Sequence, residues 1–301
     1  MRPVVSVGNL TTGGRGKTPT VAWLARMLVE AGERPAILSR GYARRNADEG
    51  VTVVSDGVHL LADLARSGDE PLLLAREVPG AAVFVCDDRA LAGTLAERVF
   101  GATVHLLDDG FQHLQLARDV DLVVVRPSDL LDRPMPFGRL REPVQALEAA
   151  HAVIMDSASA DDATGGGRAR PTFLLRRSLG RPVPLEADRP WPDDAHPVVA
   201  VAGIAEPGRF PRALEAAGWT VARTLTFADH HAYTRGDLER IVRIASRVGA
   251  VGIVTTAKDA MRLLPLRPLS MPVAYVPLDV SIEPVSTFRP WFFDELRKAR
   301  A

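Results

Sequence analysis

Short runs of apolar residues, many of them β-branched, alternate with helical patterns along almost the whole chain. Val21, Leu24, Ala25 and Leu28 illustrate the helical pattern, because they recur at the spacing of one helix face before Gly32 ends it. The apolar runs are typical of strands that are buried on both faces, as in a parallel sheet. They predict strands at Val4–Val7, Ala36–Ser39, Val51–Val54, Ala82–Cys86, Val104–Leu107, Asp121–Val125, Ala152–Met155, Thr172–Leu175, Val198–Ala202, Thr220–Thr224, Gly252–Thr255 and Val273–Val276.

The alternation of strands and helices indicates βαβ units joined by right-handed crossovers. We therefore expect an α/β fold with a mainly parallel sheet flanked by helices. The segment Asp156–Arg170 interrupts the pattern, since it is small, polar and rich in glycine, which is typical of a domain boundary. The expected organisation is a core domain over residues 1–156, a linker that contains strands over 157–196, and a second, smaller α/β domain over 197–301.

Composition places the chain among ordinary globular proteins, with 301 residues of which 47% are hydrophobic and 25% charged. The 37 basic and 37 acidic residues balance, so no overall charge attracts nucleic acid, and we expect no nucleic-acid partner. The single cysteine, Cys86, excludes an internal disulfide and indicates a reducing, cytoplasmic compartment. No apolar run approaches the roughly 18 residues that a membrane span needs, which predicts a soluble or peripheral protein.

The strongest local signal is a predicted strand that leads through a glycine-rich turn into a helix, over Val4–Pro19. Glycines let backbone N–H groups converge on phosphate oxygens, and the helix N-terminus adds a partial positive charge. Lys17 is placed to reach the β- and γ-phosphates of a nucleotide, and Thr18 is placed to bind Mg²⁺. Pro19 lies in the first helical turn, where its missing N–H costs little. The pattern predicts a P-loop and hence a P-loop NTPase-like fold.

One position departs from the common P-loop pattern, because Thr11 stands where that pattern has its first glycine. The alternative is a glycine-rich turn that binds no nucleotide. The register of strand, loop, lysine, threonine and helix favours the nucleotide site. Lysine is also rare in this arginine-rich chain, where it occurs only as Lys17, Lys258 and Lys298, so a lysine inside the motif indicates a need for an ammonium group.

The second half of a nucleotide site is a carboxylate at a strand end, and Asp108-Asp109 provides it directly after an apolar run. In P-loop enzymes an aspartate in this position holds Mg²⁺, either directly or through water. Alone, such a pattern is usually only the end of a strand. Behind a P-loop, the doubled aspartate predicts a magnesium site.

Further short motifs follow in a fixed order over most of the chain. They are Val7-Gly-Asn-Leu-Thr11 with Gly13-Gly-Arg-Gly-Lys-Thr-Pro19, Ser39-Arg-Gly-Tyr42, Gly68-Asp-Glu-Pro71, Asp88-Arg89, Asp108-Asp-Gly-Phe-Gln-His113, Leu140-Arg-Glu-Pro143, Ala202-Gly-Ile204, Phe227-Ala-Asp-His-His231 and Thr256-Ala-Lys-Asp259. In this order they resemble the lipid A 4′-kinase (tetraacyldisaccharide 4′-kinase) family. Its members transfer the ATP γ-phosphate to the 4′-hydroxyl of a lipid-linked glucosamine disaccharide 1-phosphate.

The resemblance implies a catalytic pair. Asp69 is similar to the family's catalytic base, and His230, in the second domain, is similar to the imidazole that orients this carboxylate and takes up the proton. Without the resemblance, Asp69 would be read as a turn or helix-capping acid. His230 would be read as a structural histidine, with Asp229 fixing its tautomer.

The resemblance also implies the ligands of ATP, Mg²⁺ and substrate. The residues expected around ATP are Asn9, Thr11, Gly13, Gly14, Arg15, Gly16, Lys17, Thr18 and Pro19. Those expected on the metal side are Thr18, Asp108, Asp109 and Glu142, although Glu142 could equally form a surface ion pair with its neighbour Arg141. Those expected to contact substrate are Arg40, Tyr42, Glu70, Arg89, Gln112, His113 and Arg141, since guanidinium groups suit phosphate.

A lipid-linked substrate implies peripheral contact with a membrane, on the cytoplasmic face of the inner membrane for this family, and no obligate protein partner is inferred. Members usually carry a basic, hydrophobic helical segment before the first strand, whereas this sequence begins at the strand, so we expect either that Met1 is not the natural start or that another surface contacts the membrane. Trp291-Phe-Phe293, near Arg297 and Lys298, is one candidate. A packed C-terminal helix is the favoured alternative, because such aromatics are most often in the core.

Two departures from the family pattern lie in the second domain, where Ala257 replaces a glutamate and Ala205-Glu206 replaces a small polar pair. The main competing hypothesis is a P-loop switch or delivery NTPase, which hydrolyses nucleotide to drive partner binding and needs no base for a sugar hydroxyl. The presence of Asp69 beside an otherwise complete P-loop favours the kinase.

Overall fold

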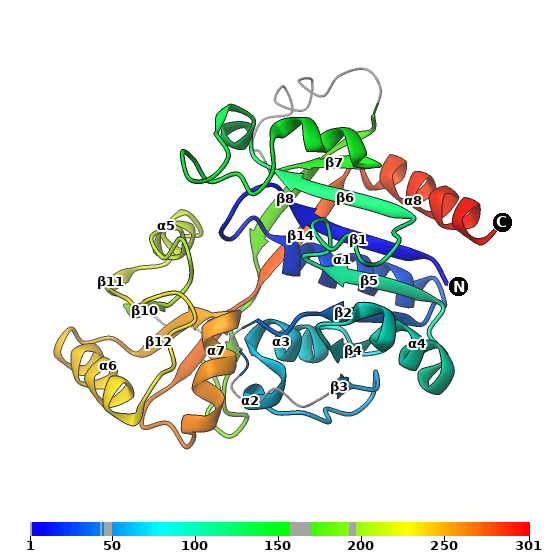
Figure 1. Cartoon of the computed structure of the whole chain (residues 1–301). Coiled ribbons are helices and arrows are strands. Elements are labelled where there is room, and N and C mark those ends of the chain that lie inside the picture. Colours follow the sequence, from blue (N-terminus) through cyan, green and yellow to red (C-terminus); the bar gives the residue numbers. More distant parts are fainter. Residues whose placement is uncertain (1, 43, 45–49, 157–169, 193–196) are drawn as a thin grey trace. The chain divides into compact units, whose positions relative to one another are not determined.

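The computed structural model describes residues 2–42, 44, 50–156, 170–192 and 197–301 (Figure 1). Residues 157–169, which make up most of the expected domain boundary, therefore lie outside the described residues. Internal contacts divide the chain into two compact units. Unit 1 comprises Met1–Arg177 and Val280–Ala301, and unit 2 comprises Ser178–Asp279.

A nine-stranded sheet forms the centre of unit 1, in the order β14-β8-β7-β6-β1-β5-β2-β4-β3. Its strands are β1 (Val4–Asn9), β2 (Pro35–Ser39), β3 (Thr52–Ser55), β4 (Ala82–Val85), β5 (Val104–Asp108), β6 (Val120–Val125), β7 (Ala152–Met155), β8 (Thr172–Leu179) and β14 (Leu278–Glu283). Strands β8, β7, β6, β1, β5, β2 and β4 pair in parallel, and β3 joins β4 antiparallel. The expected α/β fold with a mainly parallel sheet is confirmed.

Alternate residues of each strand face opposite sides of this sheet, and both sides are buried. Val5 and Val7 of β1 belong to one core cluster, whereas Val4 belongs to another. This burial on both faces explains why the strands appear in the sequence as continuous apolar runs. The helical segments of unit 1 are α1 (Lys17–Glu30), α2 (Leu64–Ser67), α3 (Asp69–Glu77), α4 (Arg89–Phe100), α8 (Val285–Arg300) and the 3₁₀ turns η1 (Pro127–Leu131) and η2 (Val144–Ala149).

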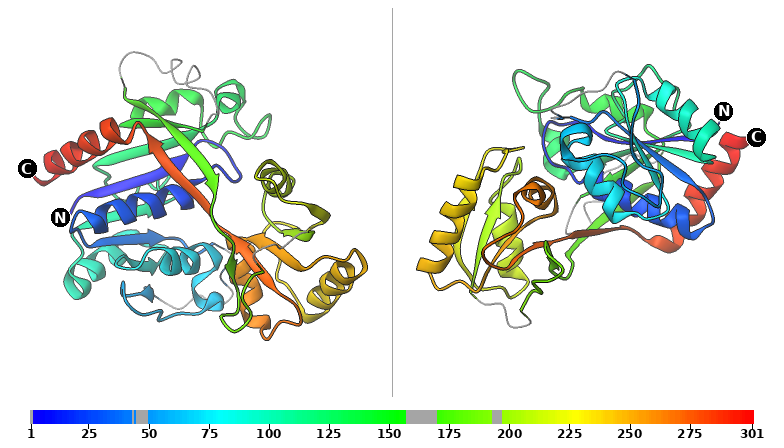
Figure 2. Two further views of the ribbon diagram at one scale, coloured as in Figure 1. Left: turned by 180° about the vertical axis from the view of Figure 1, so that it is seen from behind. Right: turned by 90° about the horizontal axis from the view of Figure 1, so that it is seen from below.

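Helices α1 and α8 cover the same face of the sheet, which Figure 2 shows from behind. The predicted apolar face of α1 is buried there, including Leu24 and Leu28. Phe288 of α8 packs against Trp23 and Phe173, with ring centroids 5.6 and 4.9 Å apart. Helix α4 packs on the opposite face.

The two units divide the chain differently from the domains expected from the sequence. Residues 280–301, expected in the second domain, belong to unit 1, because β14 joins the large sheet beside β8 and α8 packs against its core. Phe292 is completely buried, and Trp291 and Phe293 are partly buried against the same core. These aromatics therefore form a packed C-terminal helix, not an exposed patch.

Unit 2 contains a five-stranded sheet in the order β11-β10-β12-β13-β9. Its elements are β9 (Val183–Pro184), β10 (Val198–Ala202), α5 (Arg209–Ala216), β11 (Val221–Thr226), α6 (Arg235–Arg247), β12 (Gly252–Thr256), α7 (Ala257–Leu263), η4 (Leu264–Leu266) and β13 (Val273–Val276). The first four strands of that order are parallel, and β9 is antiparallel to β13. Strands β9 and β14 have no counterpart among the predicted strands.

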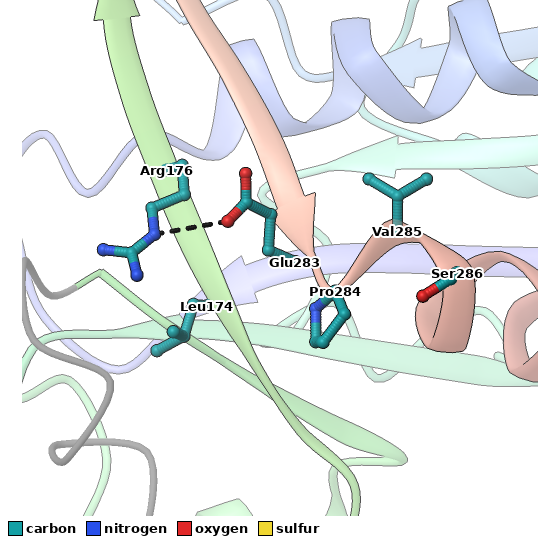
Figure 3. A pocket seen from close by; sticks show the side chains of 6 residues that line it. All are labelled: Leu174, Arg176, Glu283, Pro284, Val285 and Ser286. Atoms are coloured by element: carbon teal, nitrogen blue, oxygen red, sulfur yellow. Dashed lines mark hydrogen bonds and ion pairs between the residues drawn. The ribbon is translucent and has the colours of Figure 1, made fainter.

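A surface pocket of about 530 Å³ lies between β8 and the junction of β14 with α8 (Figure 3). It is lined by Leu174, Arg176, Glu283, Pro284, Val285 and Ser286. Arg176 Nε lies 3.4 Å from Glu283 Oε2 across it. None of the residues that the sequence predicts for the active site lines this pocket.

Candidate active site

The turn that joins β1 to α1 has the backbone that a phosphate site requires. Gly13 and Gly16 have φ values of 99° and 88°, in the left-handed region where a side chain would be strained. Gly16 is the N-cap of α1 and provides no side-chain hydrogen bond to the helix. The first N–H groups of a helix have no partner within the helix, so this end of α1 is suited to an anion.

Lys17, the first residue of α1, lies between the end of β1 and the end of β5. Its Nζ donates to Asn9 Oδ1 at 2.9 Å and lies 3.4 Å from Asp109 Oδ1. Arg141 approaches the same carboxylate with both terminal nitrogens, at 2.8 and 3.0 Å, and also donates to the Asn9 carbonyl at 2.9 Å. Gln112 donates to that carbonyl at 3.1 Å. The structure therefore gathers five residues that the sequence predicts for the site.

The cations around Asp109 favour the ionised form of its carboxyl. Burial alone would raise the pKa of its carboxyl, but Lys17 and Arg141 outweigh burial and lower the pKa below the ordinary 3.8. Its φ of 57° is also in the left-handed region, which costs free energy in a residue other than glycine. A strained, ionised carboxylate between two cations is typical of a functional site.

Thr18 and Asp108 form a second contact between α1 and β5. Thr18 Oγ1 donates to Asp108 Oδ2 at 3.3 Å, and both residues are buried. The register that pairs Val7 of β1 with Asp108 of β5 places this carboxylate beside the start of the P-loop. A hydroxyl and a carboxylate are hard oxygen ligands, which Mg²⁺ prefers.

Within the described residues, no group of three or more His, Cys, Asp or Glu side chains could hold a metal by itself. Mg²⁺ in phosphoryl-transfer sites usually takes one or two protein oxygens and completes its shell with phosphates and water. Thr18 and Asp108 therefore fit such an ion. Asp109 faces cations in this structure, and Glu142 is half-buried in the segment that follows Arg141.

Asp69 begins α3 and is almost fully buried, at 4% exposure. Its Oδ1 accepts the N–H of Glu70 at 2.9 Å. The preceding Gly68 has a φ of 83°, and a Cβ there would lie 2.9 Å from the Tyr42 carbonyl. The Gly68-Asp-Glu-Pro71 turn therefore packs against the Ser39–Tyr42 motif, and only glycine fits at the contact.

His230 belongs to unit 2, whereas Asp69 belongs to unit 1. His230 is half-buried and, like Asp109, has a left-handed backbone, with a φ of 56°. Its Nε2 lies 3.8 Å from Asp229 Oδ1, and its N–H donates to the same oxygen at 3.1 Å. Its neighbour His231 contacts Asp237 instead, at 3.2 Å.

Arg40 and Arg89, two of the arginines predicted to contact phosphates, lie near the ends of β2 and β4, and Arg40 Nε lies 3.6 Å from Asp87 Oδ1. Arg89 is buried at the start of α4, and its Nη1 donates to the Asp87 carbonyl at 3.2 Å. Burial, and then repulsion from Arg40, lowers the pKa of the Arg89 guanidinium. Burial likewise lowers the pKa of His113, and Arg89 adds to the effect. Tyr42 is 69% exposed.

Three residues that the sequence did not predict, Arg126, Asp156 and Arg177, hold the backbone of the P-loop. Arg126 donates to the Gly14 carbonyl at 3.1 Å, and Arg177 donates to the Arg15 carbonyl at 2.8 Å. Asp156 Oδ2 accepts from both guanidinium groups at 2.8 Å. Since the C=O and the N–H of one trans peptide group point in opposite directions, holding the Gly14 and Arg15 carbonyls outward turns the next N–H groups towards the other side, where a ligand would bind. Arg126 and Asp156 each directly follow a parallel strand, which is the one signal that the sequence offered.

Comparisons with known proteins agree with this geometry. Residues 1–296 match the family model described as tetraacyldisaccharide-1-P 4′-kinase. A tetraacyldisaccharide 4′-kinase from Syntrophus aciditrophicus is 38% identical over 318 residues, covering 95% of this chain and 82% of the relative. One from Anaeromyxobacter sp. (strain K) is 43% identical over 280 residues, covering 87% and 72%.

A solved structure with the same architecture is the crystal structure of LpxK from Aquifex aeolicus in complex with ATP. It has a TM-score of 0.80 and 30% sequence identity, and the match covers 98% of this chain and 89% of that one. The family predicted from the motifs is thereby confirmed. The chain belongs to the tetraacyldisaccharide-1-P 4′-kinase family and is a kinase of lipid A biosynthesis, which phosphorylates a hydroxyl group.

Proposed function

We propose that the P-loop of unit 1 binds ATP and that its γ-phosphoryl group is transferred to the 4′-hydroxyl of a tetraacyldisaccharide 1-phosphate. The observation that carries this proposal is the contact of Lys17 with Asp109 beside the contact of Thr18 with Asp108. The Aquifex LpxK structure was solved in complex with ATP, which supports the same ligand for this chain. The switch or delivery NTPase is not favoured, because the relatives are kinases.

In the proposed complex, the amides at the N-terminus of α1 and the Lys17 ammonium bind the phosphates of ATP. Arg141 lies next to Lys17 and adds a second cation for the charge that spreads over the γ-phosphoryl oxygens during transfer. The other P-loop residues, from Asn9 to Pro19, determine the shape of the phosphate-binding turn. Preorganised cations and amides of this kind stabilise the transition state without having to move.

Mg²⁺ fits beside Thr18 and Asp108, and the further acidic candidates are Asp109, which follows Asp108, and Glu142, which follows Arg141. When bound, the ion neutralises charge on the phosphate oxygens. Asp109 differs from Asp108 in that Lys17 and Arg141 already balance its charge. We therefore assign Asp108 to the ion and give Asp109 the additional task of holding the two cations in place.

We assign the role of general base to Asp69. The 4′-oxygen attacks the γ-phosphorus, the bond to the β,γ-bridging oxygen breaks, and ADP leaves with that bond's electron pair. The hydroxyl proton passes to the Asp69 carboxylate, and His230 orients this carboxylate and takes up the proton. The burial of Asp69 supports the assignment, because a base shielded from bulk water exchanges its proton with a bound hydroxyl and not with solvent.

The remaining candidates are proposed to contact the substrate. The guanidinium groups of Arg40 and Arg89 suit a phosphate, and His113, Tyr42, Glu70 and Gln112 offer hydrogen-bonding groups for the disaccharide. The acyl chains of such a substrate reside in a bilayer, so the protein is proposed to act peripherally on the cytoplasmic face of the inner membrane. Within the described residues no helix has the length and apolar character required to cross a membrane.

The decisive test is to incubate the purified protein with Mg-ATP and tetraacyldisaccharide 1-phosphate and to locate any added phosphate by ³¹P NMR and mass spectrometry. The proposal requires a second monoester phosphate at the 4′-position, with one ADP formed per phosphate transferred. Hydrolysis of ATP at a rate that does not depend on the sugar acceptor would contradict it.

A further inference from the structure

Large apolar side chains are exposed in the segment that follows β6. Leu131, Met135 and Phe137 are 89%, 53% and 84% exposed. We call residues 131–139 the apolar loop. The chain has ten phenylalanines, all of them among the described residues, and Phe137 is the only one that is exposed. Such a concentration of exposed apolar groups on a folded domain usually marks an interaction surface.

The apolar loop has a defined conformation. The Met135 N–H donates to the Leu140 carbonyl at 2.9 Å, and the Leu140 N–H donates to the Arg133 carbonyl at 3.0 Å. The side chain of Asp132 accepts from the Arg139 Nε at 2.9 Å and so closes the base of the loop. Since the loop is held by its own hydrogen bonds, the exposure of its apolar side chains is a property of the folded state.

The base of the apolar loop is attached to the P-loop. The Thr12 N–H donates to the Arg139 carbonyl at 2.9 Å, and Thr11 and Leu140 form an isolated antiparallel bridge. Arg141, the next residue, binds Asp109. The apolar loop therefore projects from the same backbone that shapes the phosphate site, at the carboxyl end of the parallel strands.

Charge on the apolar loop favours an anionic surface. Arg133 is exposed, and Arg139 is exposed and forms an ion pair with Asp132. The loop thus carries two arginines against one aspartate. Exposed aliphatic and aromatic side chains flanked by arginine are typical of segments that enter the interface of an anionic bilayer.

We propose that the apolar loop inserts Leu131, Met135 and Phe137 into the surface of an anionic phospholipid bilayer and so holds the phosphate site at the membrane. This inference rests on the proposed function, because it is the acylated acceptor that makes a bilayer the partner. It identifies the membrane-binding surface as a part of unit 1 that is attached directly to the catalytic machinery.

The test compares two double variants of the full chain. Leu131→Ser with Phe137→Ser removes two exposed apolar groups of the loop, and Val58→Ser with Val99→Ser removes two that are similarly exposed elsewhere in unit 1. Flotation with vesicles of phosphatidylcholine, with and without phosphatidylglycerol, measures binding. We expect the loop variant to bind about a hundredfold more weakly and the matched control to bind as wild type, since each of the two side chains contributes about one factor of ten when it is buried in the bilayer. Arg133→Gln is expected to lose the preference for phosphatidylglycerol.

Turnover of detergent-dispersed substrate separates this inference from the proposed function. Both double variants are expected to keep the wild-type kcat and KM there. Wild-type vesicle binding by the loop variant, equal loss in the control, or no binding by the wild type would overturn the inference. So would a raised KM for dispersed substrate with vesicle binding unchanged, because the loop would then contact the acyl chains of the substrate. Loop-dependent vesicle binding without any kinase activity would instead leave the inference standing and refute the proposed function.

Discussion

Arg15 and Asp129, which lie 114 positions apart, form a buried ion pair beneath the P-loop. Arg15 Nε lies 3.0 Å from Asp129 Oδ2, Nη2 lies 2.7 Å from Oδ1, and both side chains are 1% exposed. The side chain of Arg15, expected at the nucleotide, therefore anchors the loop to η1, while its backbone remains part of the turn. That Arg15 binds ATP stays a prediction, and with the side chain held by Asp129 it is the main chain of Arg15 that would make the contact.

This pair predicts a large effect on stability. Asp129→Ala removes the carboxylate that balances the buried Arg15 guanidinium, and breaking such a buried pair typically costs about 3–5 kcal/mol. Urea unfolding followed by tryptophan fluorescence measures the loss. The double replacement Arg15→Met with Asp129→Leu is expected to cost less than Asp129→Ala alone, since it removes both charges. A loss below about 1 kcal/mol for the single variant would show that the pair contributes little.

Asp156 predicts an effect on ATP binding through the backbone. Asp156→Ala frees Arg126 and Arg177 from their shared acceptor, so the Gly14 and Arg15 carbonyls are held less firmly. We expect the KM for ATP to rise about tenfold, with a smaller change in kcat at saturating ATP. Asp294 is the matched control, because it also pairs with two cations, Arg297 and Lys298, but on the exposed face of α8. If Asp294→Ala raises the KM equally, the effect is not specific to the loop.

The cations around Asp109 predict a pH dependence. The folded pKa of Asp109 lies below the ordinary 3.8, so its ionisation stabilises the fold fully above the unfolded pKa, and this contribution is lost as pH falls through the folded pKa. Arg141→Gln removes one cation while burial remains, so the pKa of Asp109 should rise. The acid limb, which is the fall in the free energy of unfolding as pH decreases, should then move to higher pH.

Chemical denaturation from pH 7 down to pH 3 measures this limb. Arg139→Gln provides a control, because Arg139 is a nearby arginine whose partner is Asp132 and not Asp109. We expect no shift of the limb for the control beyond the loss of its own pair. An unchanged limb in Arg141→Gln would mean that Lys17 alone determines the ionisation of Asp109.

The proposed base predicts a loss of turnover with ATP binding intact. Asp69→Asn keeps the shape of the side chain and its acceptor oxygen for the Glu70 N–H, but it cannot accept the proton. We expect kcat to fall by about 10²–10⁴. Calorimetric titration with ATP should give the wild-type dissociation constant. Asp63→Asn is the control, since Asp63 caps the preceding short helix α2 and lies outside the proposed chemistry. A fully active Asp69→Asn would remove Asp69 from the mechanism.

The sequence by itself determined most of the helices and strands and the residues that form the P-loop. Strand periodicity and turn residues act within a few positions, so β1, α1 and the glycines that need positive φ could be predicted from local physics. Asp108 at the end of β5 was predictable for the same reason. The catalytic assignments of Asp69 and His230 needed the resemblance to a family, because neither residue carries a local signal that distinguishes it from a structural one.

Tertiary structure decided which distant residues meet. The return of β14 and α8 to unit 1 could not be predicted, because strand order in a sheet depends on pairing between segments far apart in the chain. The same holds for Arg15 with Asp129 and for Arg126 and Arg177 around Asp156, which come from segments far apart in the chain. Local sequence encodes backbone conformation, whereas the partner of a buried charge is fixed only when the sheet brings its strand ends together.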